Sequence, residues 1–160
     1  MSRSTGFTLI ELLIATAILI VALVGILAAY QSCFSLTETA RNLTAALNAD
    51  QAKMEEMRNY NFNLLATDYG TGGVNNIFPA SGLSGNRKGK IYIQYVSSPQ
   101  DGSLLQVKVV ICWQERGGRV VGEDKNLNGV LDTAPLPSED TNGNGEINSP
   151  CELTTLMAQR

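Results

Sequence analysis

The N-terminal part of the chain is an almost uninterrupted run of apolar residues. No charged side chain occurs from Leu12 to Thr37, and the first 19 of these positions, Leu12 to Tyr30, are almost entirely Leu, Ile, Val and Ala. A helix of about 20 apolar residues is long enough to cross the hydrocarbon core of a bilayer. The pattern therefore predicts a membrane-spanning helix.

One carboxylate lies at the edge of this apolar run. Placing a charged side chain such as that of Glu11 at the middle of a bilayer costs roughly 2.5–3.5 kcal/mol. An acid in such a segment therefore usually has a function. No basic residue occurs between Glu11 and Thr37, so this part of the helix offers the carboxylate no partner. The sequence predicts that a cation from elsewhere pairs with it.

After Tyr30 the pattern becomes amphipathic. Apolar residues recur at alternating spacings of four and three, with Asp50 as the one polar residue on the stripe. The stripe consists of Leu36, Ala40, Leu43, Leu47, Met54 and Met57. The two patterns together predict one continuous helix from about Phe7 to about Arg58, in which residues 7–30 lie in an apolar environment such as a membrane and residues 31–58 pack on a folded head.

The rest of the chain has the pattern of a small antiparallel sheet. Residues 59–89 contain many Gly and Asn residues and are expected to form a long loop. Alternation predicts strands at Lys90–Ser97 and Leu104–Trp113, and shorter strands are expected at Arg119–Val121 and Cys151–Ala158. The apolar face of the second strand carries Leu105, Val107, Val109 and Ile111.

These elements predict an α+β fold. The long N-terminal helix packs on an antiparallel sheet of three or four strands within residues 90–160, and residues 123–150 are inserted before the last strand. Residues 98–102, which include Pro99 and Gly102, are expected to turn the first two strands into a hairpin. One face of the sheet should be buried and the other exposed.

The residues around the start of the helix form a specific motif. Gly6, Phe7, Thr8, Leu9, Ile10 and Glu11 follow a short polar leader that contains Arg3. This order of leader, small residue, aromatic residue, glutamate and long apolar helix resembles the prepilin-peptidase signal of type IV pilins and type II secretion pseudopilins. The resemblance is strong along the N-terminal helix and extends to the head only as an architecture.

The resemblance implies a processing and assembly pathway. Residues 1–6 would be removed by prepilin peptidase between Gly6 and Phe7, Phe7 would be N-methylated, and Glu11 would pair with the N-terminal amine of a neighbouring subunit. The expected partners are homologous pilin or pseudopilin subunits, prepilin peptidase and an inner-membrane assembly platform. Because Arg3 keeps the leader cytoplasmic, the precursor is expected to cross the bacterial inner membrane once, with its head in the periplasm, before entering a filament.

Two simpler interpretations explain less of this N-terminal pattern. A secretory signal peptide has a shorter apolar core without an acid and is cleaved after that core. A plain single-pass anchor leaves Glu11, next to Gly6 and Phe7, without a role. The apolar half contains no proline, unlike that of many major pilins, so the resemblance is closest to minor pilins or pseudopilins.

Composition narrows the classes of function. The chain has no histidine, which removes the commonest general base and the usual transition-metal ligand, so we expect no enzymatic activity. Its formal net charge is -3 at pH 7, so no nucleic-acid partner is expected.

A repeated stretch occurs within the expected head. Residues 123–132 and 139–148 both read Glu-Asp-x-Asn-x-Asn-Gly-x-aliphatic-Asp/Asn. From the Asp onward this matches positions 1–9 of an EF-hand calcium loop, where side-chain oxygens at positions 1, 3, 5 and 9 and the carbonyl at position 7 bind the ion. The expected ligands are Asp124, Asn126, Asn128, Val130 and Asp132 in the first copy and Asp140, Asn142, Asn144, Glu146 and Asn148 in the second.

The two copies also depart from the EF-hand pattern. Position 12, normally a bidentate glutamate, is Pro135 in the first copy and Cys151 in the second, and no helix is expected beside either loop. They look like the helix-free calcium loops of dockerin-like and thrombospondin-type-3 repeats. Glu139 or Glu152 is a candidate ligand from outside its own loop.

The charge of this insertion also favours a bound cation. Between Glu123 and Glu152 there are seven acids and one base, so the segment should repel itself without a cation. We expect one or two calcium ions, bound at about 10⁻⁴–10⁻³ M because the bidentate ligand is missing. Leu131 or Ile147, at position 8, would pack inward. The alternative is a disordered insertion rich in Asn and Gly.

The three cysteines leave two possibilities open. Cys112 and Cys151 bracket the insertion, so a disulfide between them would close its base, with Cys33 left over. The alternative is three free thiols, since unpaired Cys is a common core residue.

The sequence as a whole predicts a structural subunit of a type IV pilus or a type II secretion pseudopilus with a calcium-stabilised head. The alternative is a membrane-tethered calcium-binding module that does not polymerise.

Overall fold

The structure, a computed structural model, consists of two compact units. It describes residues 6–83, 85–96, 104–134 and 138–159. The first unit ends at Thr39 and the second begins at Ala40. The helix α1 contributes to both units, and the strands all belong to the second.

Helix α1 spans Leu9–Arg58, which confirms the predicted continuous helix. Thr8 precedes it, and its hydroxyl oxygen accepts the backbone N–H of Glu11 at 3.3 Å, as a helix N-cap does. Within the helix, the hydroxyls of Thr16, Ser32 and Thr37 donate to carbonyls one turn back at 2.9, 3.2 and 2.8 Å. These three hydroxyls are thus satisfied within the helix, as lipid favours.

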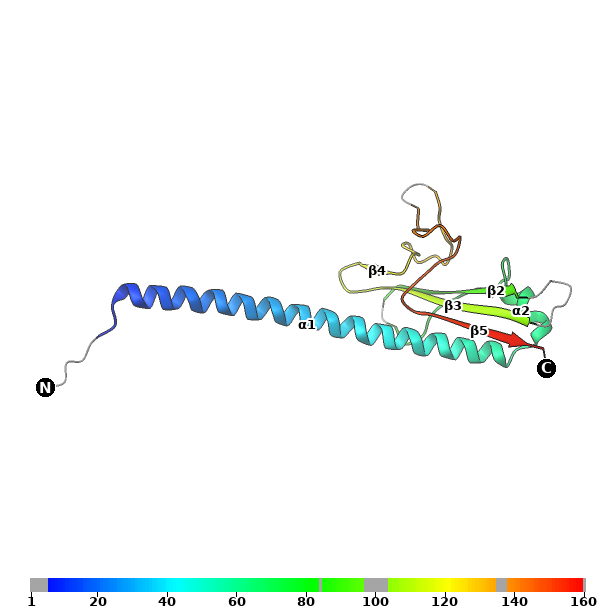
Figure 1. Cartoon of the computed structure of the whole chain (residues 1–160), viewed down its shortest axis with the longest axis horizontal. Coiled ribbons are helices and arrows are strands. Elements are labelled where there is room, and N and C mark those ends of the chain that lie inside the picture. The colour runs from blue at the N-terminus through cyan, green and yellow to red at the C-terminus, as the bar shows by residue number, and fades with distance from the viewer. Residues whose placement is uncertain (1–5, 84, 97–103, 135–137, 160) are drawn as a thin grey trace. The chain divides into compact units, whose positions relative to one another are not determined.

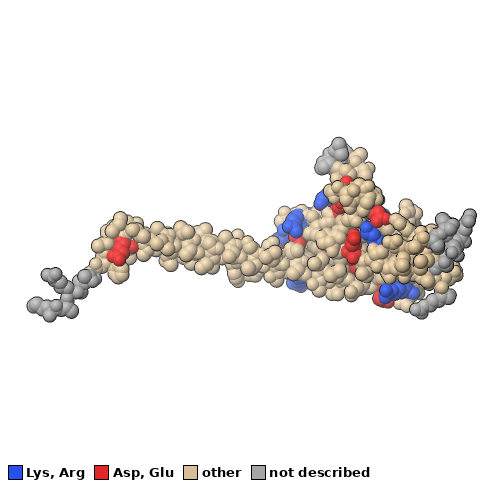
Figure 2. Space-filling view, in the orientation of Figure 1, with Lys and Arg blue, Asp and Glu red and all other residues tan. Residues whose placement is uncertain are grey.

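The part of α1 in the first unit buries none of its large apolar side chains. Those from Leu9 to Leu36 are all more than half exposed. Figure 2 shows this stretch as an uncharged surface with one acidic patch near its start. Among the described residues, α1 is the one helix long and apolar enough to cross a membrane.

The second unit contains an antiparallel sheet built around one long strand. The strands are β1 (Ile77–Phe78), β2 (Arg87–Tyr95), β3 (Leu104–Gln114), β4 (Val120–Val121) and β5 (Glu152–Ala158). Strand β3 pairs with β2 along one edge. Its other edge pairs with β5 over Leu104–Val110 and with β4 at Trp113 and Gln114. The hairpin of β2 and β3 is confirmed, whereas its predicted turn at residues 98–102 lies outside the described residues.

The part of α1 in the second unit packs on one face of this sheet (Figure 1), so the predicted α+β fold is confirmed. Alternate residues of β3 point toward the helix because side chains alternate between the faces of a strand. The β3 residues on this face are Leu105, Val107, Val109, Ile111 and Trp113, and all are buried. The first four are those predicted from the pattern. They pack with Met54 and Met57 of α1 in one core.

The buried stripe of α1 differs from the predicted one in its first half. Leu36 is 70% exposed and Leu47 is also exposed. The buried helix residues are Asn42, Ala46, Ala49, Asp50, Met54 and Met57. The prediction followed a spacing of 3.5 residues back from Met57, but a straight helix turns once every 3.6 residues. The buried line therefore rotates by about 20° per heptad relative to the predicted one, which shifts burial from the position of Leu47 toward that of Ala46.

The segment 59–89, predicted as a loop, contains two elements and the start of a third. Helix α2 spans Phe62–Tyr69 and is capped by Asn61, whose side chain accepts the N–H of Asn63 at 3.1 Å. Strand β1 follows, and β2 begins at Arg87 rather than Lys90. The prediction was wrong here because two helical turns and a two-residue strand are too short to produce a periodic pattern.

The second face of the sheet is covered at one end, where it was expected to be exposed. Val110 and Cys112 of β3 form a separate buried cluster with Leu127 and Ile147 of the insertion. The buried Ile147 confirms that position 8 of the second copy packs inward, and Leu131 of the first is partly buried against the same cluster. The head therefore has three layers at this end: helix, sheet and insertion.

Candidate functional site

The predicted cleavage point lies just before the helix. Gly6, Phe7 and Thr8 precede α1, and the Phe7 side chain is 84% exposed. The Gly6–Phe7 peptide bond is therefore in a non-helical, accessible segment, as a peptidase requires. Glu11 lies in the first turn of α1, where the helix dipole favours a carboxylate, and it is exposed.

The first loop of the insertion, residues 124–132, brings the four predicted side-chain ligands into direct contact. The backbone N–H of Asn128 donates to Oδ1 of Asp124 at 3.1 Å and to Oδ1 of Asn126 at 2.9 Å. Oδ2 of Asp132 accepts from Nδ2 of Asn126 at 2.6 Å and from Nδ2 of Asn128 at 3.1 Å. Positions 1, 3, 5 and 9 of this loop thus converge. Val130, at position 7, donates its N–H to Oδ1 of Asn128 at 2.6 Å.

The second loop, residues 140–148, has the same geometry only over its first half. Oδ1 of Asp140 accepts the N–H of Asn144 at 3.2 Å, and so does Oδ1 of Asn142 at 3.0 Å. Oδ1 of Asn144 accepts the N–H of Glu146 at 2.8 Å. Asn148, at position 9, bonds none of the other predicted side-chain ligands of its loop. Its side chain contacts Lys108 and Glu123, and within the loop it donates only to the position-7 carbonyl of Glu146, at 3.1 Å.

A glycine at position 6 turns each loop sharply. Gly129 has a φ of 81° and Gly145 a φ of 75°, in the left-handed region that favours glycine. Their N–H groups donate to Oδ2 of Asp124 at 2.8 Å and to Oδ2 of Asp140 at 3.0 Å. The glycine role expected from the loop pattern is therefore present in both copies.

The two loops bind each other through the glutamates that precede them. Glu123, just before the first loop, accepts the N–H groups of Thr141 at 3.1 Å and of Asn148 at 3.0 Å. Glu139, just before the second loop, accepts the N–H groups of Lys125 at 2.7 Å and of Asp132 at 3.0 Å. Each glutamate thus holds positions 2 and 9 of the other loop. The repeated Glu-Asp pair in the sequence was the signal for this exchange.

Backbone hydrogen bonds connect the two loops in the same reciprocal way. The N–H of Glu123 donates to the carbonyl of Asn148 at 2.9 Å, and the N–H of Glu139 donates to the carbonyl of Asp132 at 2.8 Å. These equivalent contacts relate the loops by an approximate two-fold symmetry. The loops therefore form one structural unit. Glu139 reaches the first loop by accepting its backbone N–H groups, and its role as a calcium ligand stays a prediction.

Burial and hydrogen bonding act in opposite directions on two carboxyls of this unit. Burial alone would raise the pKa of Glu123, but hydrogen bonds from Thr141 and Asn148 outweigh it and hold the pKa below its ordinary value. Burial raises the pKa of Asp124 in spite of the N–H groups it accepts, and the nearby Glu139 raises it further. The ionised Asp124 is thus electrostatically unfavourable, and a cation would relieve this.

The donor set of the first loop fits a hard cation. It offers two carboxylates and two amides on converging side chains, together with the Val130 carbonyl, and oxygen is the ligand that calcium prefers. Among the residues that the structure describes, no three His, Cys, Asp or Glu side chains form a metal cluster. Calcium binding therefore stays a prediction. It fits the first loop better than the second.

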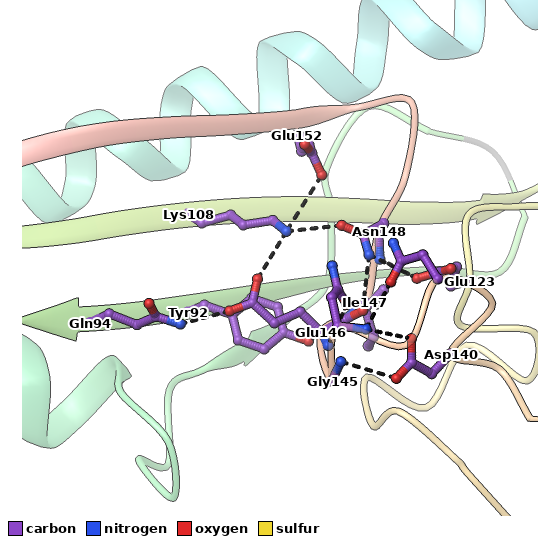
Figure 3. A network of polar contacts seen from close by, with 12 residues as sticks. Tyr92, Gln94, Lys108, Glu123, Asp140, Gly145, Glu146, Ile147, Asn148 and Glu152 are labelled. Carbon is purple, nitrogen blue, oxygen red and sulfur yellow. Dashed lines mark hydrogen bonds and ion pairs between the residues drawn. The ribbon is translucent and has the colours of Figure 1, made fainter.

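A polar network that the sequence did not predict fastens the second loop to the sheet (Figure 3). Lys108 of β3 donates to Oε2 of Glu146 and to Oδ1 of Asn148, both at 3.0 Å. From β2, Gln94 donates to Oε1 of Glu146 at 2.8 Å, and the hydroxyl oxygen of Tyr92 accepts the N–H of Ile147 at 2.7 Å. Tyr92 and Lys108 are cross-strand partners, so their side chains lie on the same face.

The predicted disulfide between Cys112 and Cys151 is absent, and Cys33, Cys112 and Cys151 are all free. The N–H of Ile111 donates to the carbonyl of Cys151 at 3.2 Å, so these two residues lie opposite each other. Opposed residues point to the same face and consecutive residues to opposite faces. Cys151 therefore faces α1, while Cys112 faces the insertion. Proximity in the sheet was predicted correctly, but the side-chain directions prevent the bond.

Comparison with known proteins identifies the N-terminal segment. Residues 1–27 match the family model described as the prokaryotic N-terminal methylation motif, the prepilin signal of type IV pilins and pseudopilins. No curated protein and no solved structure matches the chain significantly. The predicted resemblance is confirmed for the motif, which supports a pilin-like or pseudopilin precursor. It also suggests a structural rather than an enzymatic protein.

Proposed function

We propose that this chain is a structural subunit of a type IV pilus or a type II secretion pseudopilus, processed by prepilin peptidase and polymerised through α1. The observation that carries the proposal is the methylation motif at the start of a helix whose large apolar side chains are exposed from Leu9 to Leu36. So large an apolar surface needs lipid or other helices around it. A subunit that leaves the membrane for a filament exchanges contact with lipid for contact with the helices of other subunits.

Glu11 is the residue that would direct this exchange. It is the one charged residue from Gly6 to Thr37, and in lipid or in a packed bundle its carboxylate is unfavourable without a cation. Cleavage after Gly6 creates a new amine on Phe7. The amine of one copy and the carboxylate of another neutralise each other only at a fixed stagger between helices, so the pair would define the register of the filament.

The same proposal places the precursor in the bacterial inner membrane with its head in the periplasm. The processed chain would then join homologous subunits at the assembly platform. The nearest groups by sequence pattern are minor pilins and pseudopilins. The alternative, a membrane-tethered calcium-binding module, shares the helix but gives Glu11 no partner.

Substitution of Glu11 separates these two functions. Glu11→Ala is expressed in the native cells beside a control, Glu38→Gln, which lies on the same helix beyond the apolar run. We expect both variants to be cleaved after Gly6 and only Glu11→Ala to be lost from sheared filaments or pseudopili. Incorporation of Glu11→Ala at the level of the unsubstituted chain would contradict the filament proposal and favour the tethered module.

We also infer that the head binds calcium in the first loop. Support comes from the convergence of Asp124, Asn126, Asn128 and Asp132 and from the raised pKa of Asp124. The full chain in detergent micelles should melt at a higher temperature in millimolar calcium than in a chelator, because a ligand that binds only the folded state stabilises it. Asp124→Asn should abolish the difference. Equal melting of the unsubstituted chain in both conditions would refute calcium binding.

A further inference from the structure

Lys108 makes an unusual set of contacts. Its side chain is 14% exposed and lies on the face of β3 that bears the insertion, opposite to the face of Val107 and Val109. The ammonium contacts Glu146 and Asn148 at 3.0 Å and Oε2 of Glu152 at 3.6 Å, and it lies 5.8 Å from the ring centroid of Tyr92. A largely buried lysine is stable only with such compensation. Figure 3 shows these groups gathered around the lysine on the face of the sheet that bears the insertion.

Two of these oxygens belong to residues at ligand positions of the second loop, although at position 7 a calcium loop uses the backbone carbonyl and not the side chain. Asn148 is at position 9, and its Oδ1 is taken by the lysine while its Nδ2 donates to Glu123 at 3.0 Å. Glu146 is at position 7, and its carboxylate is shared between Lys108 and Gln94. With position 9 engaged in this way, the converging part of the second loop contains a single carboxylate, Asp140.

Among the residues that the structure describes, the first loop has no equivalent of this arrangement. Its residue at position 7 is Val130, which is apolar and 48% exposed. Its residue at position 9, Asp132, receives neutral amide N–H groups from Asn126 and Asn128. In the described part of the chain no ion pair joins Asp124 or Asp132 to a basic side chain. The two copies therefore differ in charge compensation, although both follow the same loop pattern.

We propose that Lys108 supplies the second loop with the positive charge that a metal ion supplies in loops of this sequence, so that this loop folds without metal. The insertion then consists of one metal-independent loop, fastened to the sheet by Lys108, Tyr92 and Gln94, and one metal-dependent loop held against it by Glu123 and Glu139. The statement about the first loop rests on the calcium binding proposed above, whereas the statement about Lys108 does not.

The exchange of glutamates gives the metal-independent loop a second role. Glu139 is fixed at the start of the second loop and receives the N–H groups of Lys125, Asn126 and Asp132 from the first. Once the second loop is docked, this carboxylate is in place to order the first. Lys108, by docking the second loop, thereby helps to position the first loop, which would bind the calcium ion.

Hydrogen exchange of the full chain in detergent micelles tests the role of Lys108 directly. In a chelator, we expect the N–H groups of Ile147 and Asn148 to be protected in the unsubstituted chain and to exchange at least tenfold faster in Lys108→Met. Lys108→Arg, which keeps the charge, should retain most of the protection. Lys88→Met is the matched control, because Lys88 is on the same face of the sheet and forms no ion pair in the described part of the chain.

Two results would overturn the proposal. One is loss of protection at residues 146–148 of the unsubstituted chain in the chelator, and the other is unchanged protection in Lys108→Met. Should Lys108→Met loosen the whole head, Glu146→Gln removes the same ion pair from the loop side, and it should raise exchange locally by a smaller factor. If the N–H groups of residues 146–148 exchange at the same rate in Glu146→Gln as in the unsubstituted chain, the result would then count against the proposal.

The number of bound ions gives an independent readout. Native mass spectrometry with calcium should show one ion on the unsubstituted chain and a second on Lys108→Met, in which Glu146, Asn148 and Glu152 are released. Two ions on the unsubstituted chain would refute the proposal. Absence of any ion from the unsubstituted chain would refute the calcium binding proposed for the first loop, and the exchange data in the chelator would still decide the role of Lys108.

Discussion

Asp50 makes the stability of the head depend on pH. It is fully buried on the face of α1 that packs on the sheet, where the other positions of the stripe were predicted to be apolar. Its Oδ2 lies 2.9 Å from the Sγ of Cys151, whose thiol donates to it, and its Oδ1 has no partner among the described residues. Burial raises the pKa of Asp50 to about 7; the thiol opposes this, and Glu152 adds to it.

The direction of the pH effect follows from this raised pKa. The unfolded chain releases the Asp50 proton near its ordinary value of 3.8, while the folded chain keeps it until about 7. The folded state therefore binds more protons over this range, and the free energy of unfolding falls as the pH rises from about 4 to about 7. With roughly 1.4 kcal/mol for each pH unit of difference, the loss between pH 5 and pH 8 is about 2–3 kcal/mol.

The single tryptophan provides the assay. Trp113 is buried in the core of the head, so urea unfolding of the full chain in micelles can be followed by its fluorescence. We expect the free energy of unfolding to decrease by about 2–3 kcal/mol from pH 5 to pH 8 in the unsubstituted chain and to lose this part of its pH dependence in Asp50→Asn. Glu55→Gln, an exposed carboxylate on the same helix, should keep the original dependence.

The reasoning would be refuted by either of two results. The first is the same pH dependence in Asp50→Asn and in the unsubstituted chain. The second is an unsubstituted chain that becomes more stable between pH 5 and pH 8, since this would require a folded-state pKa below that of the unfolded chain.

Two further predictions concern the insertion and the thiols. Gly129→Ala should destabilise the head by about 1–3 kcal/mol more than Gly145→Ala. Both glycines have positive φ, but only at Gly129 would a Cβ lie 2.6 Å from a side chain, that of Ile77. Equal urea midpoints of the two variants would contradict this. Without reductant, alkylation followed by mass spectrometry should add one label to the native chain and three in denaturant, because Cys33 is exposed while Cys112 and Cys151 are buried. One label in denaturant would indicate a disulfide.

The parts of the fold that could be predicted are those with long patterns. The apolar run and the amphipathic stripe define α1 over many turns, and the alternation in β3 places Val107, Val109 and Ile111 on one face. The buried face of a long helix is harder to predict, because the small difference between 3.5 and 3.6 residues per turn adds up along its length. Leu47 was therefore predicted to be buried where Ala46 is.

The parts that could not be predicted depend on contacts between distant residues. Lys108 is one lysine in an apolar strand, and nothing in its neighbourhood in the sequence indicates that residues 38 and 40 positions away bind it. The disulfide was predicted from two positions that do come close in the sheet, but a strand directs its side chains alternately to two faces. The motif of Gly6, Phe7 and Glu11 was predictable because its chemistry is local.

The central claim is that the chain is cleaved and then polymerised. Intact-mass spectrometry of the chain from sheared extracellular filaments and from the membrane fraction of its native cells tests this directly. The account predicts a species that begins at methylated Phe7; its dominance in filaments would indicate a major subunit, and its scarcity there a minor pilin or a pseudopilin. A chain that retains residues 1–6 in both fractions would contradict the account.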